Sequence, residues 1–172
     1  LTVDTPVQGA RNRQTRARFG LPAGVTAPYM SDLTAGKAIA DSSRGMITTW
    51  KDVEWLKSIA NGPVLIKGIL DGNDAERCVA AGADGIIVSN HGARNLDTAP
   101  ATIDALPEVA ERVDRKIPLL VDGGIRRGTD IIKAIALGAD AVLIGRPYCY
   151  GLAVGGAAGV ARVIEILRTE LT

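Results

Sequence analysis

Four short apolar runs, each followed by a segment with a helical pattern, constrain the fold of this chain more than any other feature. The runs cover residues 64–69, 85–89, 119–122 and 141–145. They are rich in Val, Ile and Leu, which is typical of strands that are buried on both faces of a parallel sheet. Because helical segments alternate with these strands, the sequence predicts an α/β fold with a parallel sheet.

A repeated sequence pattern gives the period of this alternation. The segment AGAD at 81–84 precedes one apolar run, and LGAD at 137–140 precedes another, so that Gly82 and Gly138 are 56 residues apart. A (β/α)₈ barrel of ~250 residues has about 31 residues per unit, so this offset fits two βα units. A doubly wound open sheet alternates strand and helix in the same way. We favour the barrel because no GxGxxG follows the first strand and the phosphate-binding signals come late.

Capping signals divide the rest of the chain into helices. The segment Leu1 to Thr5 resembles one further strand that is cut at its start, and residues 9–48 form a long connection. We therefore expect a single partial domain over residues 1–172, the C-terminal half of a (β/α)₈ TIM barrel, from the end of strand 4 through strand 8 and the final helix. The first expected helix is capped by Thr49 and runs through Ala60, and the second is capped by Asn73 or Asp74 and ends at Gly82. The third is capped by Thr129 and stops at Gly138, and the last runs from about Ala157 to Leu171.

Composition excludes several classes of partner. The net charge is +1, from 20 basic and 19 acidic residues, which gives no reason to expect nucleic acid or an anionic membrane as a partner. No apolar run approaches the ~20 residues of a membrane span, and no secretory leader is visible. Cys78 and Cys149 lie outside any CxxC spacing, which fits a reducing cytoplasm and predicts a cytoplasmic location. With one histidine in the chain, no metal site is expected.

The last two strands end in glycine and arginine. One run continues into Asp122-Gly123-Gly124-Ile125-Arg126 and the other into Gly145-Arg146. Glycines let backbone N–H groups approach phosphate oxygens, and arginines add charge-assisted hydrogen bonds. TIM barrels bind phosphate groups after strands 7 and 8, so these two endings predict a phosphate site. The alternative is that the glycines only turn the chain.

The earlier strands end in groups that can move protons and bind anions. His91 follows the second run, with Arg94 three residues later, and this places a base beside an anion-binding group. Lys67 lies between Ile66 and Gly68 in an apolar run, where a lysine is costly unless it is paired or faces a ligand. Asp4 occupies a comparable place on the cut strand. Arg11, Arg13, Arg16 and Arg18 cluster in the connection, where most of them are expected on a solvated helix face.

The stretches LTVDTP, IKGI, SNHGARNLD, DGGIRRGTD and IGRP occur in this order across the chain. In this combination the chain resembles the FMN-dependent α-hydroxy acid dehydrogenases and oxidases, the family that oxidises glycolate, lactate and mandelate. The resemblance covers essentially all residues. It implies FMN as cofactor, a small 2-hydroxy acid as substrate and a homo-oligomer for the complete protein. The implied reaction converts an L-2-hydroxy acid to a 2-oxo acid and passes electrons to oxygen or another acceptor.

The resemblance also implies a role for each motif residue. His91 is the expected base, Asp4 holds its imidazole, and Arg94 and Arg11 clamp the substrate carboxylate. The family commonly has HGGRQLD where this chain has HGARNLD, so that Ala93 adds a methyl group beside Arg94. The expected FMN-binding residues are Thr2, Lys67, Ser89, Asp122, Gly123, Gly124, Ile125, Arg126, Gly145 and Arg146.

Two other functions stay open from the residues alone. The first is another phosphate-binding barrel enzyme, such as a nucleotide dehydrogenase with a loop cysteine or a sugar-phosphate isomerase. Neither Cys78 nor Cys149 is expected on a suitable strand-end loop. The second is a non-catalytic half barrel that serves as an assembly unit, because open sheet edges invite pairing with a second half or copy.

Overall fold

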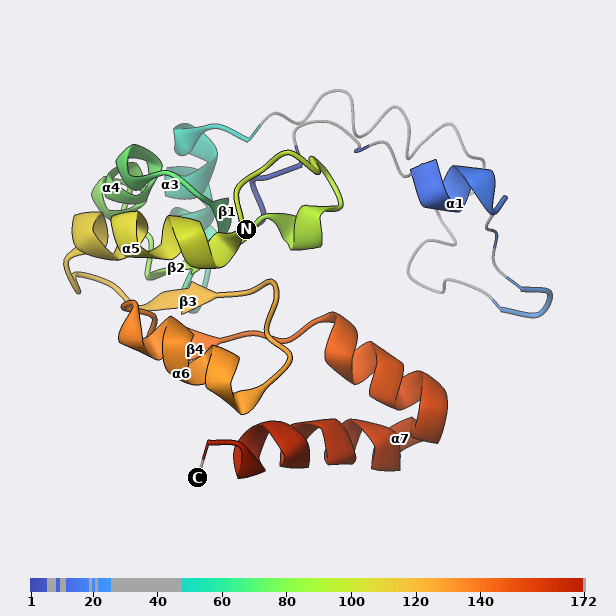
Figure 1. Cartoon of the computed structure of the whole chain (residues 1–172). Helices are drawn as coiled ribbons and strands as arrows, with labels where there is room; N and C mark the ends of the chain where they lie inside the picture. The colour runs from blue at the N-terminus through green and yellow to red at the C-terminus, as the bar shows by residue number, and fades with distance from the viewer. Residues whose placement is uncertain (6–8, 10–11, 19, 21, 26–47, 172) are drawn as a thin grey trace.

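The computed structural model describes residues 1–5, 9, 12–18, 20, 22–25 and 48–171. Strands and helices alternate along most of this part of the chain (Figure 1). The prediction of an α/β fold with a parallel sheet is confirmed. The elements are α1 (Asn12–Arg16), α3 (Trp50–Ile59), β1 (Leu65–Ile69), α4 (Gly72–Ala80), β2 (Gly85–Val88), η2 (His91–Ala93), α5 (Thr102–Val113), β3 (Leu119–Val121), α6 (Gly128–Ala136), β4 (Ala141–Val142) and α7 (Arg146–Thr169).

The sheet has four parallel strands in the order β1-β2-β3-β4. A parallel bridge joins Thr2 to Lys67, so the N-terminal segment lies beside β1 at the edge of the sheet. Chain order and spatial order therefore agree across all the described strands. A doubly wound sheet reverses its strand order at a switch point, and no reversal occurs among these strands, which favours the barrel arrangement.

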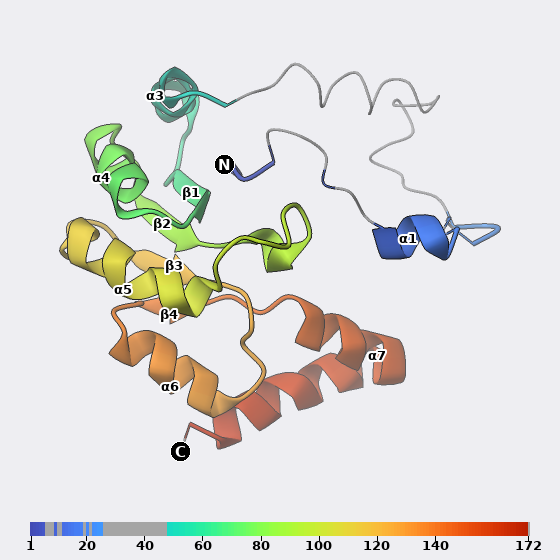
Figure 2. The same cartoon turned by 45° about the horizontal axis from the view of Figure 1, so that its top comes forward.

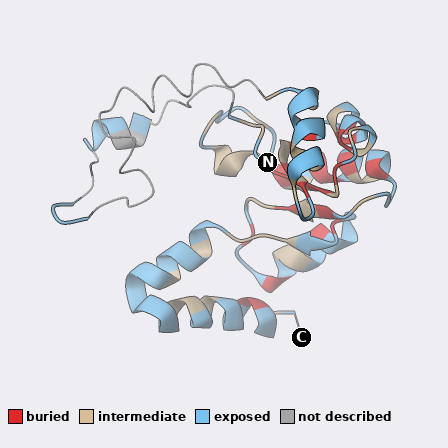
Figure 3. Cartoon of the chain, turned by 180° about the vertical axis from the view of Figure 1, so that it is seen from behind, coloured by how far each residue is buried: buried red, intermediate tan, exposed pale blue. Residues whose placement is uncertain are grey.

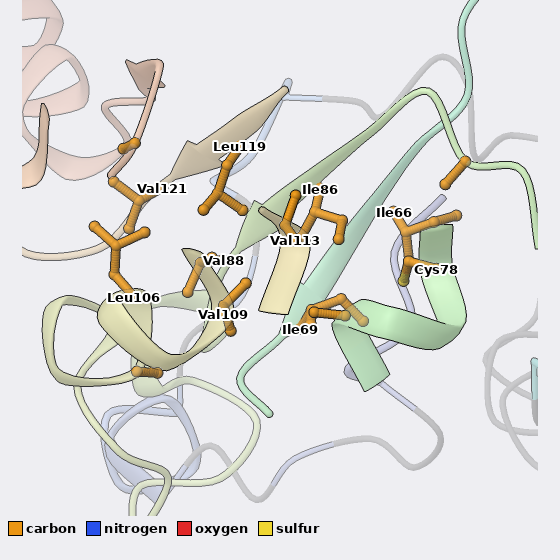
Figure 4. Packing of buried hydrophobic residues seen from close by; sticks show 14 of the residues in the cluster. Ile66, Ile69, Cys78, Ile86, Val88, Leu106, Val109, Val113, Leu119 and Val121 are labelled. Atoms are coloured by element: carbon orange, nitrogen blue, oxygen red, sulfur yellow. The ribbon is translucent and has the colours of Figure 1, made fainter. Parts of the chain in front are cut away.

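The two faces of the sheet differ in burial: the buried residues of β1, β2 and β3 gather in the part of the molecule that the helices cover (Figure 3). Ile66, Ile86 and Val88 are fully buried, and they pack with residues of α4 and α5 such as Cys78 and Leu106 (Figure 4). The opposite face carries Leu65, Lys67, Ile87 and Leu120, which are only half-buried. The expectation of strands buried on both faces is therefore wrong for these residues. Helices α4, α5 and α6 lie along the same side of the sheet, and α4 contacts α5 (Figure 2).

Helix α5 is the helical segment expected after the second apolar run, but no cap or bounds were predicted for it, although it supplies much of the core. Its residues Leu106, Val109 and Val113 are buried at a spacing that fits one helix face. Its start carries no capping side chain, because Ala101 is the N-cap, and Pro107 interrupts the pattern inside the helix. Proline inside a helix and a missing cap both weaken the sequence signal for a helix.

The repeated Gly-Ala-Asp segments have the same structural role. Asp84 N–H donates to the Val64 carbonyl, while a carboxylate oxygen of Asp84 accepts from Val64 N–H at 2.6 Å. Asp140 makes the same two bonds with Leu119, and its carboxylate accepts at 2.8 Å. Each aspartate thus latches the start of one strand to the start of the next, and the sequence repeat records this bond pattern.

Two of the expected caps are wrong by a few residues. The N-cap of α4 is Asp71, whose carboxylate accepts from the N–H groups of Asn73 and Asp74. Helix α6 begins after Arg127 rather than at Thr129, and the Asp130 carboxylate accepts from the N–H groups of Arg126 and Arg127. The Thr49 cap is confirmed, because Thr49 N–H and its hydroxyl both donate to Asp52. A carboxylate near a helix start satisfies N–H groups that have no partner in the helix.

Helix α7 starts at Arg146, earlier than the expected Ala157, and bends sharply at Gly155 and Gly156. By length and composition alone α7 could cross a membrane, which the sequence analysis did not expect. The bend divides it into two shorter segments, neither of which reaches the ~20 residues that a continuous span requires. The segments approach closely, since a side chain on Gly151 would lie 2.7 Å from the Gly159 carbonyl. Most of α7 is exposed, including Leu152 and Val154 (Figure 3).

Candidate active site

A cavity of about 600 Å³ lies where the strands end. Lys67 reaches it from β1, His91 and Arg94 from the loop after β2, Asp122 from the end of β3, and Arg146 from the start of α7. Parallel strands carry their carboxyl ends at one edge of the sheet, so residues distant in sequence meet there. The lining residues are Lys67, His91, Gly92, Arg94, Asp122, Gly123, Gly124, Ile125, Arg126, Leu143, Ile144, Gly145, Arg146, Pro147, Tyr148, Cys149 and Tyr150.

His91 and Asp4 form a hydrogen-bonded pair beside this cavity. His91 Nδ1 lies 3.1 Å from Asp4 Oδ1, with the two side chains 33% and 13% exposed. Because a carboxylate only accepts hydrogen bonds, Nδ1 carries the proton and Nε2 is the nitrogen that can take up another. Gly68 allows the aspartate to sit close to β1, since a side chain there would lie 2.7 Å from Asp4 Cβ. The pair therefore has the geometry of an oriented general base.

The loop that carries His91 has an unusual backbone. His91, Gly92 and Ala93 have φ values of 55°, 66° and 57°, all in the left-handed region. Residues other than glycine rarely adopt this region, and such strain is concentrated at functional sites. The Asn90 side chain supports the turn by accepting from Ala93 N–H at 3.2 Å and donating to the Pro100 carbonyl at 3.1 Å. Sequence reasoning did not single out Asn90.

Lys67 lies in a polar cluster that joins three strand ends. Its Nζ donates to Ser89 Oγ at 2.8 Å and lies 3.2 Å from Asp122 Oδ2. Ser89 is fully buried, and its hydroxyl also accepts from His91 N–H at 3.1 Å. The lysine that looked costly in an apolar strand is therefore paired, as buried charges must be.

Three hydrogen bonds fix the glycine-rich segment after β3. Gly123 and Gly124 have φ values of 89° and 79°, and a side chain on Gly123 would lie 2.9 Å from Thr102 Oγ1. The Thr102 hydroxyl donates to the Asp122 carbonyl at 2.5 Å. Donation from Arg126 N–H, with help from Arg127 N–H, keeps the pKa of the Asp130 carboxyl below its usual value. These contacts fix the segment while Arg126 reaches the cavity.

The end of β4 brings an arginine and a helix start to the same cavity. Gly145 is the N-cap of α7, and helix N-termini favour anions because their first N–H groups are unpaired. Arg146 Nη2 donates to the Gly92 carbonyl at 2.7 Å, which connects this arginine to the loop that carries His91. The first turn of α7 also places Tyr148, Cys149 and Tyr150 on the cavity wall. Cys149 therefore lies closer to the site than expected.

The expected site residues fall into three groups. His91, Arg94, Lys67 and the two glycine-arginine endings line one cavity. Thr2, Asp4 and Ser89 lie behind it, where Thr2 pairs with β1 and the other two bind lining residues. Arg11 lies outside the described residues. Among the described residues no cluster of His, Cys, Asp and Glu could hold a metal ion.

The cavity fits a phosphorylated cofactor that carries hydroxyl groups. Its volume falls within the ~300–1,000 Å³ typical of small-molecule sites. Arg126, Arg146 and the start of α7 provide positive charge and free N–H groups for a phosphate. Asp122 Oδ1 is buried and has no hydrogen-bond partner in the described part of the chain, so it can accept from a ligand hydroxyl. Lys67 adds a cation that can face a developing negative charge.

The profile of the FMN-dependent dehydrogenase family matches residues 1–172. An L-lactate oxidase of Nostoc sp. (strain PCC 7120) is 51% identical over 185 residues, which is 99% of this chain and 50% of the relative. A peroxisomal (S)-2-hydroxy-acid oxidase of Oryza sativa subsp. japonica is 50% identical over 179 residues, covering 99% of this chain and 49% of the relative. The chain thus spans about half the length of the curated relatives that it matches.

Solved structures show the same likeness. A crystal structure of mandelate oxidase superposes with a TM-score of 0.86 and 45% identity, over 99% of this chain and 48% of the other. A mandelate oxidase with (S)-2-phenylpropionate gives a TM-score of 0.84 and 43% identity, over 99% of this chain and 47% of the other. With the family profile matched from its first residue to its last, this chain belongs to the FMN-dependent dehydrogenases.

Proposed function

We propose that the protein oxidises an L-2-hydroxy acid to a 2-oxo acid with FMN, and passes the electrons to oxygen or another acceptor. The observation that carries this proposal is the His91–Asp4 pair, which lies beside Arg94 at a cavity that fits a phosphorylated cofactor. The proteins that this chain resembles include an L-lactate oxidase, a peroxisomal (S)-2-hydroxy-acid oxidase and a mandelate oxidase. The other phosphate-binding barrel enzymes and the non-catalytic half barrel are not favoured by these relatives.

The described residues divide the work of the reaction. Arg94 pairs with the substrate carboxylate, since a guanidinium presents two parallel N–H donors to a carboxylate. His91 Nε2 takes up a substrate proton, and the Asp4 carboxylate at Nδ1 stabilises the imidazolium that results. FMN, when bound, accepts the two electrons. Lys67 would offset the negative charge that FMN gains on reduction, while Arg126, Arg146 and the α7 N-terminus would hold its phosphate.

We also infer that the five aligned strand segments form the second half of a (β/α)₈ barrel. The half-buried face with Leu65, Lys67, Ile87 and Leu120 is the face that fills a closed barrel. The edge of β4 and the apolar residues of α7, such as Leu152 and Val154, have no covering element in the described part of the chain. Expressed alone, the chain is expected to self-associate or to bind FMN weakly. A monodisperse monomer that keeps stoichiometric FMN through gel filtration would contradict this inference.

The test of the activity uses the protein with its complete barrel and starts with the visible spectrum after purification. Bound flavin absorbs in the visible, and anaerobic addition of glycolate, L-lactate or (S)-mandelate is expected to bleach it, whereas D-lactate is not. His91→Gln keeps a polar side chain but no base, so flavin reduction is expected to slow by roughly 10²–10⁴-fold with FMN still bound. Arg168→Lys, on the exposed last turn of α7, is the matched control. Flavin reduction at the wild-type rate in the Gln variant would refute the proposed role of His91.

A further inference from the structure

The ion pair between Lys67 and Asp122 has a consequence for the charge that the cavity presents. Lys67 Nζ and Asp122 Oδ2 are 3.2 Å apart, and their side chains are 23% and 18% exposed. An ion pair this close and this shielded is less screened by salt than a surface pair. The lysine therefore presents a partly compensated charge to whatever occupies the cavity.

The position of Lys67 does not depend on Asp122 alone. Ser89 Oγ accepts from the same ammonium group at 2.8 Å, and Ser89 is fully buried at the end of β2. The Asp122 main chain is fixed separately, because its N–H donates to the Val88 carbonyl at 3.0 Å and its carbonyl accepts from Thr102. Neutralising Asp122 as asparagine thus leaves an oxygen acceptor in place and leaves the serine anchor untouched.

We propose that Asp122 is a positioning residue and counter-ion of Lys67, and that it sets how strongly the lysine stabilises a reduced or anionic flavin. This inference rests on the proposed function, since it concerns the same FMN site. Removing the carboxylate charge exposes the full charge of an ammonium that Ser89 still holds. Asp122→Asn therefore makes the flavin easier to reduce, and Lys67→Met makes it harder.

Sulfite is a suitable probe, because it adds to oxidised flavin and leaves a negative charge on the ring system. The protein with its complete barrel is loaded with FMN and freed of unbound FMN, and sulfite binding is titrated by loss of visible absorbance. One uncompensated unit charge near the ring predicts about tenfold tighter sulfite binding and a higher flavin midpoint potential in Asp122→Asn. Asp114→Asn, an exposed site at the C-terminal end of α5, is the matched control and is expected to leave both quantities unchanged.

A second pair of variants separates action through Lys67 from a direct effect on the flavin. In the Lys67→Met background, Asp122→Asn is expected to change sulfite affinity by less than about threefold, because the group it compensates is absent. Equal changes in both backgrounds, or weaker sulfite binding in the single Asn variant, would overturn the proposal. If Asp122→Asn does not accumulate as folded protein, Asp122→Ser removes the same carboxylate charge beside Lys67. That variant is expected to tighten sulfite binding in the same direction; weaker or unchanged binding would overturn the proposal.

The proposed function fails in a different way. A wild-type protein with the complete barrel that shows no flavin absorbance, or whose flavin no 2-hydroxy acid bleaches, refutes the enzyme assignment. If the wild-type flavin is reduced by a 2-hydroxy acid but the flavin midpoint potential of Asp122→Asn is unchanged, only the role of Asp122 is refuted.

Discussion

Because the backbone at Ala93 is left-handed, we expect glycine to stabilise the protein at this position, whereas a substitution to glycine usually destabilises a protein. Ala93 has a φ of 57°, where its Cβ crowds the following carbonyl group. An L-residue in this region costs roughly 1–2 kcal/mol. Replacing it with glycine removes that cost but makes the unfolded chain more flexible, which costs about 0.4–1 kcal/mol. The difference is a net stabilisation of about 0.5–1 kcal/mol for Ala93→Gly.

Thermal unfolding at neutral pH measures this effect. For a chain of this size the gain raises the melting temperature by about 1–4 °C. Ala161→Gly, at an exposed and regularly helical position in α7, is the matched control and is expected to lose about 1 kcal/mol. The same substitution thus has opposite signs at two sites. A loss of stability in Ala93→Gly similar to that in Ala161→Gly would show that the φ value at Ala93 imposes no strain.

Three further predictions concern single side chains. Arg94→Lys keeps the charge but loses the planar pair of donors, so turnover is expected to fall about ten- to a hundredfold with FMN content unchanged. The control is Arg168→Lys. Wild-type turnover in the Arg94→Lys variant would show that Arg94 does not bind the substrate carboxylate. The Lys57 ammonium and Val64 N–H lower the pKa of Asp84, so its contribution to stability is present at neutral pH and is lost as the pH falls below about 4. In Asp84→Asn, the loss of unfolding free energy below about pH 4, measured by urea unfolding, is expected to be smaller than in the wild type, whereas Asp114→Asn is expected to leave it unchanged. An unchanged loss in Asp84→Asn would exclude the Asp84 hydrogen bonds as its source. Burial, with a smaller effect of Asp74, raises the pKa of Cys78 to about 12. A thiol reagent at pH 8 is therefore expected to label exposed Cys149 and not Cys78. Equal labelling rates for the two cysteines would contradict the buried environment of Cys78.

The parts of the fold that sequence reasoning recovered are those with local signals. Strand positions, the cap at Thr49 and the repeated Gly-Ala-Asp segments depend on residues close together in the chain. The bounds of helix α5 were not predicted although its buried face repeats regularly, because Pro107 and an uncapped start weakened the pattern. The early start of α7 was missed because Gly155 and Gly156 bend the helix and obscured the turns before it.

The candidate site was predicted residue by residue, but its connections were not. Sequence motifs identify His91, Lys67 and Arg146, yet they do not show that the arginine donates to the Gly92 carbonyl, 54 residues away in the chain. Contacts of this kind depend on which strand ends become neighbours and how each loop is bent. The buried oxygens of Asp4 and Asp122 that have no hydrogen-bond partner in the described part of the chain likewise emerge only from the packed structure.

The latches of Asp84 and Asp140 lie at the opposite end of the strands from the cavity. The cavity end contains groups that lower stability, namely the strained turn at His91 and two buried carboxylate oxygens without hydrogen-bond partners among the described residues. The latched end contains fully satisfied bonds that offset such losses. The stabilising hydrogen bonds and the candidate site therefore lie at opposite ends of the sheet. Substitutions that stabilise the end with Asp84 and Asp140 can accumulate without changing the cavity. The stability gained in this way allows the loops around the cavity to vary.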